Sequence, residues 1–291
     1  TMVDEYWRGM LGSETIPALL FFFIIFLIPE SPRWLIVHGE GAKASSVLQK
    51  IYLSPDEASR QKSITEDSIK GEVKTEWKAL LSPGILKAVL IGSAIAILGQ
   101  FMGVNAVLYY GPEIFKEAGL SSGDALFSQV LVGFVNMGTT VIALLIIDKV
   151  GRKNLVYWGV SGMILSLLMI GFYFIFPEQL GSIFMLVFFL FYVFCCAISI
   201  CAVVFVLLSE MYPNNVRGIA MSIAGLALWI GTYLVGQLTP WLLANVPPFA
   251  PAGTFFLFAL MCVPYLLIMW KLVPETTGKT LEEIERYWKD R

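Results

Sequence analysis

Amide and aromatic side chains interrupt several long apolar stretches of the sequence. Gln100, Asn105 and Tyr109 fall within one such stretch, where Gly103 is expected to loosen the helix locally, and Asn136 falls within the next. Burying an amide in hydrocarbon is unfavourable unless the amide finds hydrogen-bonding partners. Amides bond to hydroxyl groups and aromatic rings cover C–H faces, so this combination favours a neutral, polyhydroxylated ligand. Hydrogen bonding that only joins neighbouring helices is the alternative.

A second polar stripe follows in a later apolar stretch. Trp229, Thr232, Tyr233 and Gln237 recur at helical spacing, so they share one face of a helix. After Glu14, no charged residue falls in the middle of an apolar stretch. This pattern argues against an ionic substrate.

Charged residues of both signs gather at the ends of the apolar stretches. An anion at the C-terminal end of a helix is disfavoured unless a cation compensates it, so Asp148 needs a basic partner. Arg152 can pair with Asp148 or with Glu210 at a neighbouring helix end. Arg217 and Glu275 are further candidates for this group. Ordinary basic loop residues are the alternative interpretation.

The composition indicates a membrane protein. Of the 291 residues, 57% are hydrophobic and 14% are charged, whereas a soluble domain carries about 25% charged residues. The formal charge of −2 provides no basic surface for nucleic acid. The sequence has one histidine, too few for a typical metal site. Its four cysteines lie within apolar stretches and do not indicate a disulfide framework. No motif for phosphate binding or nucleophilic catalysis is present, so we expect neither enzymatic activity nor a cofactor.

Charge-free stretches define six expected membrane spans, and an apolar stretch with Glu14 near one end adds a seventh, because about 20 apolar residues are needed to cross a bilayer as a helix. The fold class is therefore an all-α integral membrane protein. The expected spans lie in 10–28, 88–112, 125–147, 154–177 and 179–209, with two more in 218–270 separated by a proline-rich turn at 245–253.

Short helices are expected outside the spans. Ser31-Pro32, Ser54-Pro55 and Ser82-Pro83 are typical of helix starts. We expect several amphipathic helices in 30–87, with a loop around 60–72. A last helix in the tail places Leu281, Ile284 and Trp288 on one face.

Basic residues set the orientation. Nine of the twenty lie in 30–87, and alternating the spans places eighteen on that side, leaving only Arg8 and Lys116 on the other. Since basic residues are retained on the cytoplasmic side, the N-terminus is expected outside and the C-terminus inside.

One motif occurs twice. Pro29-Glu30-Ser31 closes the first span and Pro274-Glu275-Thr276 closes the last, and the chain begins at Thr1 rather than at a methionine. If the two ends are equivalent, the chain is a fragment of a twelve-span protein that lacks helices 1–5.

Five motifs in order resemble those of the sugar porter family of the major facilitator superfamily. They are PESPR at 29–33, QFMGVN at 100–105, DKVGRK at 148–153, the Glu210 to Arg217 pair and PETTG at 274–278. The resemblance implies four parts: helix 6 in 1–29, a cytoplasmic helical linker in 30–85, a six-helix C-terminal bundle in 86–273 and an amphipathic tail in 274–291.

The resemblance also implies functional roles. The intact protein would move a sugar-like solute across the plasma membrane by alternating access, and Tyr109 and Tyr110 would act as an outer gate. The residues implied to bind sugar are Gln100, Asn105, Tyr109, Asn136 and Trp229. Those implied to form a cytoplasmic latch, intact when the pore opens outward, are Glu30, Arg33, Asp148, Arg152, Glu210, Arg217 and Glu275.

The sequence departs from the family pattern at the binding site. Gly99 stands where sugar porters usually carry a first glutamine, and Cys201-Ala202 with Phe205 replaces a Gly-Pro pair and a tryptophan. Leu228 stands where a glutamine is common. Two amides and an indole N–H are thereby lost, so we expect a more apolar pocket and no assured bend at Cys201. A deoxysugar, a polyol or a less polar solute fits these changes as well as a monosaccharide does.

Other functions stay open at this point. A transporter-like sugar sensor and a non-transporting fragment both fit the sequence. Proton symport and facilitated diffusion are equally open, since a proton-coupling carboxylate is expected in the missing helices and Glu14 is interpreted as interfacial.

Overall fold

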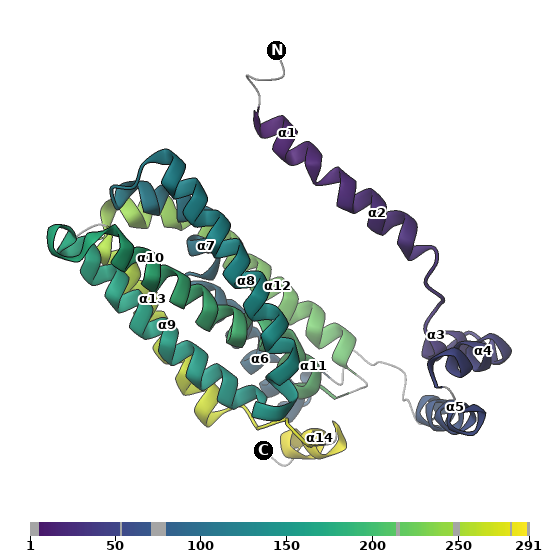
Figure 1. Cartoon of the computed structure of the whole chain (residues 1–291). Coiled ribbons are helices and arrows are strands. Elements are labelled where there is room, and N and C mark those ends of the chain that lie inside the picture. Colours follow the sequence, from purple (N-terminus) through teal and green to yellow (C-terminus); the bar gives the residue numbers. More distant parts are fainter. Residues whose placement is uncertain are drawn as a thin grey trace. The chain divides into compact units, whose positions relative to one another are not determined.

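The structure, a computed structural model, describes residues 6–52, 54–70, 80–213, 216–246, 251–279 and 281–289. Helices make up most of this part of the chain, and it contains no β-strand, which confirms the all-α fold class. The chain divides into two compact units, Thr1–Lys74 and Thr75–Arg291. Figure 1 shows the helices of both units.

The N-terminal unit begins with an apolar segment that is interrupted near its middle. Helix α1 spans Tyr6–Ser13 and α2 spans Thr15–Ile25. Pro17 has no N–H to donate to the Ser13 carbonyl and its ring crowds that carbonyl, so the helical hydrogen bonds are broken there. Glu14 keeps right-handed helical angles, with φ −65° and ψ −21°. The interruption is therefore local, and α2 alone is shorter than a bilayer requires.

Three short helices follow and pack on one another: α3 (Pro32–Val37), α4 (Gly41–Ile51) and α5 (Pro55–Lys70). The Ser31 hydroxyl accepts a hydrogen bond of 3.2 Å from the Trp34 N–H and so caps α3. Proline begins both α3 and α5, as the serine–proline pairs predict. Leu35 and Leu48 are buried between these helices.

The loop expected around 60–72 is wrong for residues 60–70, which belong to α5. Polar side chains one turn apart support this helix. The Gln61 amide donates to the Glu57 carboxylate at 3.0 Å, and Lys62 lies 3.8 Å from Glu66. Such pairs stabilise a helix that has little apolar surface to bury. Residues 71 and 72 lie outside the described part of the chain.

The C-terminal unit contains six segments long and apolar enough to cross a bilayer, counted over the described residues. Two of them are composite. Helices α6 (Pro83–Phe101) and α7 (Val104–Glu117) form the first, while α10 (Pro177–Cys196), the π-helical segment η2 (Ala197–Cys201) and α11 (Ala202–Met211) form the fourth. The others are α8 (Ser122–Val150), α9 (Arg152–Ile175), α12 (Arg217–Asn245) and α13 (Ala252–Lys271).

These six segments confirm the expected spans from residue 88 onward. The expected span at 10–28 differs, because Pro17 divides it into α1 and α2. The proline-rich turn at 245–253 falls between α12 and α13, and its residues 247–250 lie outside the described part. The domain boundaries expected at residues 29, 85 and 273 stay predictions.

Contacts between helices order the C-terminal bundle and attach the tail to one of its ends. Helix α6 packs along α12 and α13, and α9 packs against α10 and α13 (Figure 1). The tail helix α14 (Leu281–Lys289) contacts α6 and α11, with Ile284 and Trp288 buried in that contact face. The side chain of Leu281, expected on the same face, lies outside the described residues. The amphipathic tail therefore covers one end of the bundle.

Candidate functional site

A break between α6 and α7 positions the first candidate residues. Gly103 has a positive φ of 89°, and a Cβ atom at this position would lie 2.5 Å from the Phe258 ring. Only glycine fits such a conformation and approach without strain. The Tyr192 hydroxyl donates to the Met102 carbonyl at 2.9 Å and satisfies the backbone at the break. The break expected at Gly103 is thus present, and it sets Gln100 and Asn105 on two different helices.

The two amides form a small network with a hydroxyl from α12. The Asn105 Nδ2 group donates to Gln100 Oε1 at 2.6 Å, and the Thr232 hydroxyl lies 3.2 Å from the same oxygen. Thr232 has a single hydroxyl proton, which it shares between Gln100 Oε1 and the Leu228 carbonyl at 3.0 Å. Within the described residues, no partner occupies Gln100 Nε2 or Asn105 Oδ1. One donor group and one acceptor therefore stay open.

These amides line a hollow of about 310 Å³ that we term the amide cavity. Side chains from α6, α7, η2, α11 and α12 contribute to it, and none of them is charged. Trp229 is 67% exposed and Tyr109 is 61% exposed, so both aromatic side chains are accessible to a ligand. The residues that line the amide cavity are Gln100, Val104, Asn105, Leu108, Tyr109, Ile200, Cys201, Val204, Phe205, Leu228, Trp229 and Thr232.

Four of the five residues predicted to bind sugar therefore meet in one cavity, and the fifth does not line it. Asn136 on α8 borders a much smaller crevice, together with Tyr192, Cys196 and Cys201. The two predicted gate tyrosines also differ. Tyr109 faces the cavity, whereas the Tyr110 hydroxyl donates to the Gly236 carbonyl of α12 at 2.8 Å and so joins α7 to α12.

The departures from the family pattern lie mostly on the cavity wall. Cys201, Phe205 and Leu228 all line it and make that wall apolar. Gly99 does not line it: a Cβ atom there would meet Ile200 at 3.7 Å and Tyr265 at 3.8 Å. At position 99, close packing of α6 against η2 and α13 thus takes the place of a glutamine side chain.

The irregular turn in the fourth span persists without a Gly-Pro pair. Segment η2 is π-helical, and the Ser199 hydroxyl donates to the Cys195 carbonyl at 2.6 Å. Gly159 of α9 permits the close approach, because a side chain there would overlap Ser199. A π-helical turn carries one residue more than an α-helical turn, which redirects the side chains that follow.

Sequence reasoning missed one structural contributor to the cavity, Gln129 on α8. Pro112 lacks an N–H, so the Leu108 carbonyl one turn earlier in α7 loses its usual donor. The Gln129 Nε2 group donates to that carbonyl at 2.9 Å. A second amide besides Asn136 in the apolar stretch 125–147, next to a helix that contains proline, was the available signal.

A second polar group, which we term the charge cluster, joins α8, α9, α11 and the segment after α13. It consists of Asp148, Arg152, Glu210 and Thr276. The Arg152 Nη2 atom lies 2.9 Å from Asp148 Oδ1 and 2.8 Å from Glu210 Oε1. The Thr276 hydroxyl donates to Glu210 Oε2 at 2.5 Å.

Burial differs strongly within the charge cluster. The side chains of Arg152 and Glu210 are 12% and 25% exposed, whereas that of Asp148 is 77% exposed. Arg152 Nε is buried without a partner in the described part of the chain. The Arg152–Glu210 pair is therefore the shielded interaction, and Asp148 lies at its solvent-facing edge.

The other residues predicted for the latch have separate contacts. Glu275 Oε1 accepts from the backbone and hydroxyl of Thr277, and that hydroxyl accepts from the Arg152 N–H at 3.3 Å. Arg217 donates to the Tyr212 carbonyl at the end of α11 through Nε at 3.3 Å and Nη2 at 3.2 Å. Glu30 and Arg33 belong to the N-terminal unit.

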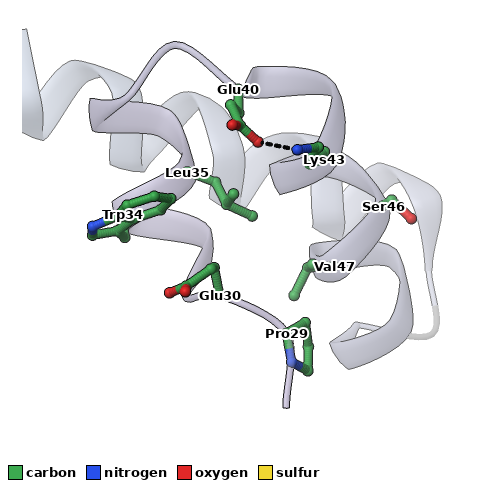
Figure 2. A pocket seen from close by; sticks show the side chains of 8 residues that line it. All are labelled: Pro29, Glu30, Trp34, Leu35, Glu40, Lys43, Ser46 and Val47. Carbon is green, nitrogen blue, oxygen red and sulfur yellow. Dashed lines mark ion pairs between the residues drawn. The ribbon is translucent and has the colours of Figure 1, made fainter. Parts of the chain in front are cut away.

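The N-terminal unit has a hollow of its own, about 440 Å³ in volume (Figure 2). Its lining carries no amide, and Lys43 Nζ is paired with Glu40 Oε2 at 2.6 Å. Although larger than the amide cavity, it lacks convergent groups for a neutral ligand. It is lined by Pro29, Glu30, Trp34, Leu35, Glu40, Lys43, Ser46 and Val47.

The sequence and the fold have counterparts among known proteins. Residues 1–288 match the family described as "Sugar (and other) transporter". The chain is 39% identical over 289 residues to the D-xylose-proton symporter of Escherichia coli K12, covering 97% of this chain and 57% of that protein. It is 37% identical over 286 residues to the arabinose-proton symporter of Bacillus subtilis 168, covering 98% of this chain and 61% of that protein.

A solved structure shows the same likeness. The proton:xylose symporter XylE, bound to 6-bromo-6-deoxy-D-glucose, matches with a TM-score of 0.81 and 39% identity. The match covers 97% of this chain and 59% of that chain. The chain thus spans somewhat more than half the length of these relatives.

Proposed function

This chain belongs to the sugar transporter family of the major facilitator superfamily, and we propose that the full-length protein moves a sugar across a membrane by alternating access. The amide cavity is the observation that carries this proposal. It offers an open donor at Gln100 and an open acceptor at Asn105, which together match hydroxyl groups that both donate and accept. Exposed rings of Trp229 and Tyr109 cover the C–H faces of the same ligand.

The substrate class is a neutral monosaccharide. The absence of charge among the residues that line the amide cavity excludes recognition of a phosphorylated or acidic sugar by this half of the site. The relatives named above carry D-xylose and arabinose, so pentoses are the first candidates. The apolar wall formed by Phe205 and Leu228 extends the range toward deoxysugars.

Transport is coupled to protons in this proposal, because both relatives are named as proton symporters. The amide cavity has no carboxylate to bind the proton. The family resemblance implies a coupling carboxylate in helices 1–5. Proton movement that accompanies sugar uptake would distinguish symport from facilitated diffusion.

The charge cluster acts as the inner latch. Arg152 links the end of α8 to the end of α11, and Thr276 adds the segment after α13. Breaking these contacts would free the helix ends to separate when the pore opens inward. Arg217 and Glu275 support the same ends, and the family resemblance implies that Glu30 and Arg33 belong to the latch as well.

The distribution of basic residues supports an orientation in which the charge cluster and the C-terminus face the cytoplasm and the protein spans the plasma membrane. A sugar sensor and a non-transporting fragment are the alternatives. The sensor predicts sugar binding without uptake, and the non-transporting fragment predicts no sugar-dependent uptake by this chain alone.

Uptake into liposomes tests the proposal directly. The full-length protein should accumulate xylose, arabinose or glucose when a proton gradient is imposed. At low sugar concentration the Gln100→Ala and Asn105→Ala variants should take up less sugar. Asn245→Ala should keep normal uptake, because the only side-chain bond of Asn245 in the described part of the chain goes to the Trp241 carbonyl of its own helix. Binding without uptake would favour the sensor, and full uptake by Gln100→Ala would contradict the site.

A further inference from the structure

Two of the four cysteines lie in contact. The Sγ atoms of Cys196 and Cys201 are 3.4 Å apart, and all four cysteines are free thiols. In an α-helix, residues five positions apart point to different sides, because each residue turns the helix by about 100°. Segment η2 begins directly after Cys196 and ends at Cys201, and its wider π-helical turn brings position i+5 back over position i. The contact is therefore a consequence of the π-helical segment.

The pair also has a route to solutes. Cys201 is exposed and lines the amide cavity, while both cysteines border the crevice beside Asn136. The two other thiols are placed differently. Cys195 lines a separate apolar hollow with Trp158, and Cys262 is buried with its Sγ 3.4 Å from the Phe258 carbonyl.

We propose that Cys196 and Cys201 form a dithiol site that binds trivalent arsenicals and obstructs the amide cavity when occupied. A monosubstituted arsenic(III) oxide reacts with two thiols to form two As–S bonds, and its oxygen leaves as water with the two thiol protons. No electrons are transferred, so no oxidant is required. Sulfur atoms that already touch need little movement to bind the same arsenic atom.

The obstruction follows from the position of Cys201. An arsenical held there projects its organic group beside Val204 and Phe205 on the cavity wall. The family resemblance places a glycine at position 201, so this site is a property of this chain. The effect on sugar rests on the proposed function, whereas arsenical binding does not.

Intact-protein mass spectrometry tests the binding site. Purified full-length protein is treated with phenylarsine oxide in the presence of excess 2-mercaptoethanol, which removes arsenic held by a single thiol. We expect an adduct that resists the monothiol and is removed by 2,3-dimercaptopropanol. Cys196→Ser and Cys201→Ser should each lose it, and Cys195→Ser should keep it. Cys196→Ala provides the same comparison if the serine variant folds poorly.

Retention of the resistant adduct in Cys201→Ser, or its mapping to Cys195 or Cys262, would overturn the site. A second measurement follows sugar binding on the same samples. Phenylarsine oxide should abolish binding in the parent protein and leave it unchanged in Cys196→Ser, and saturating sugar should slow adduct formation. An adduct that leaves sugar binding unchanged would overturn the obstruction alone. Failure of any sugar to bind would count against the proposed function, while the adduct would still establish the dithiol site.

Discussion

The charge cluster and the amide cavity differ in where their polar groups find partners. In the charge cluster, Arg152 is 12% exposed and contacts two carboxylates of the same chain, and Thr276 occupies the other oxygen of Glu210. In the amide cavity, Gln100 and Asn105 bond to each other but keep one donor group and one acceptor open. The flanking ring of Trp229 is 67% exposed.

This difference separates two functions. Polar groups that are satisfied within the chain stabilise one arrangement of its helices. Polar groups that stay open in a hollow gain their partners from a ligand. The charge cluster should therefore respond to mutation mainly through stability and conformation, and the amide cavity mainly through affinity.

Among substitutions in the two regions, removal of Arg152 should have the largest effect on stability and uptake. Arg152→Ala leaves the Glu210 carboxylate, 25% exposed, without its cation. Loss of one partner from a shielded pair lowers the free energy of unfolding by about 2–4 kcal/mol, and we expect sugar uptake to fall at least about tenfold. Thermal melting and liposome uptake of the full-length protein measure both effects.

Arg152→Lys serves as the matched control. It keeps the charge, but its side chain is shorter and its ammonium group is not at the position of Arg152 Nη2, the atom that contacts both Asp148 and Glu210, so its loss should be intermediate. Arg152→Ala with unchanged melting and unchanged uptake would remove the distinction between the two regions.

Gln100→Ala should give the next largest effect, and it should appear in affinity. The substitution removes the acceptor shared by Asn105 and Thr232 along with the open amide donor. We expect the sugar Kd to rise about tenfold, which corresponds to about 1.4 kcal/mol. Isothermal titration of the purified protein checks this value, and an equal rise in Asn245→Ala would show that the effect is not local.

Gln129→Met should lower the free energy of unfolding by a smaller amount, and it acts on the backbone of α7 beside the cavity. Methionine keeps the approximate length of the side chain but cannot donate to the Leu108 carbonyl, which Pro112 leaves without its helical partner. Leaving that carbonyl unpaired should lower the free energy of unfolding by about 1 kcal/mol. Denaturation in detergent measures the change, and unaltered stability would mean that another donor satisfies Leu108.

Asp148→Asn should have the smallest effect. Asp148 contacts the same Arg152 atom as Glu210 but is 77% exposed, so water competes for the interaction. Exposed ion pairs contribute about 0–1 kcal/mol, and we expect a change near the lower end of that range. Melting of Asp148→Asn compared with Glu210→Gln ranks the two carboxylates, and a larger loss in Asp148→Asn would reverse this assignment.

Most of the fold could be predicted because length and hydrophobicity alone decide which segments suit a bilayer. The six segments from Pro83 to Lys271 follow the charge-free stretches closely. Serine–proline pairs marked the starts of α3, α5 and α6, since proline fits the first helical turn. The break at Gly103 was also indicated by glycine within an apolar stretch.

The remaining differences depend on contacts between distant residues. The π-helical turn at η2 needs Gly159 of α9 to admit Ser199, which the local sequence does not reveal. The pairing of Gln129 with the Leu108 carbonyl joins two helices for the same reason. Residues 60–70 were expected in a loop because they are polar. Polarity alone does not indicate the side-chain pairs one turn apart that support α5.

The candidate site was only partly predictable from residue types. Helical spacing placed Trp229 and Thr232 on one face, and the structure brings that face to Gln100 and Asn105. The family resemblance implies a sugar-binding role for Asn136, which is an amide in an apolar stretch. Its position beside the smaller crevice depends on the rotation of α8, which the alternation of polar residues does not fix.

Sugar-dependent thermal stabilisation of the full-length protein, measured in parallel for the parent and for Gln100→Ala, tests the central claim most directly. A ligand at about 100 times its Kd stabilises the folded state by about 2.7 kcal/mol. We expect one pentose or hexose to raise the melting temperature of the parent, and the same concentration to have a much smaller effect on Gln100→Ala. Equal stabilisation of both proteins would place the sugar elsewhere and contradict the assignment of the amide cavity.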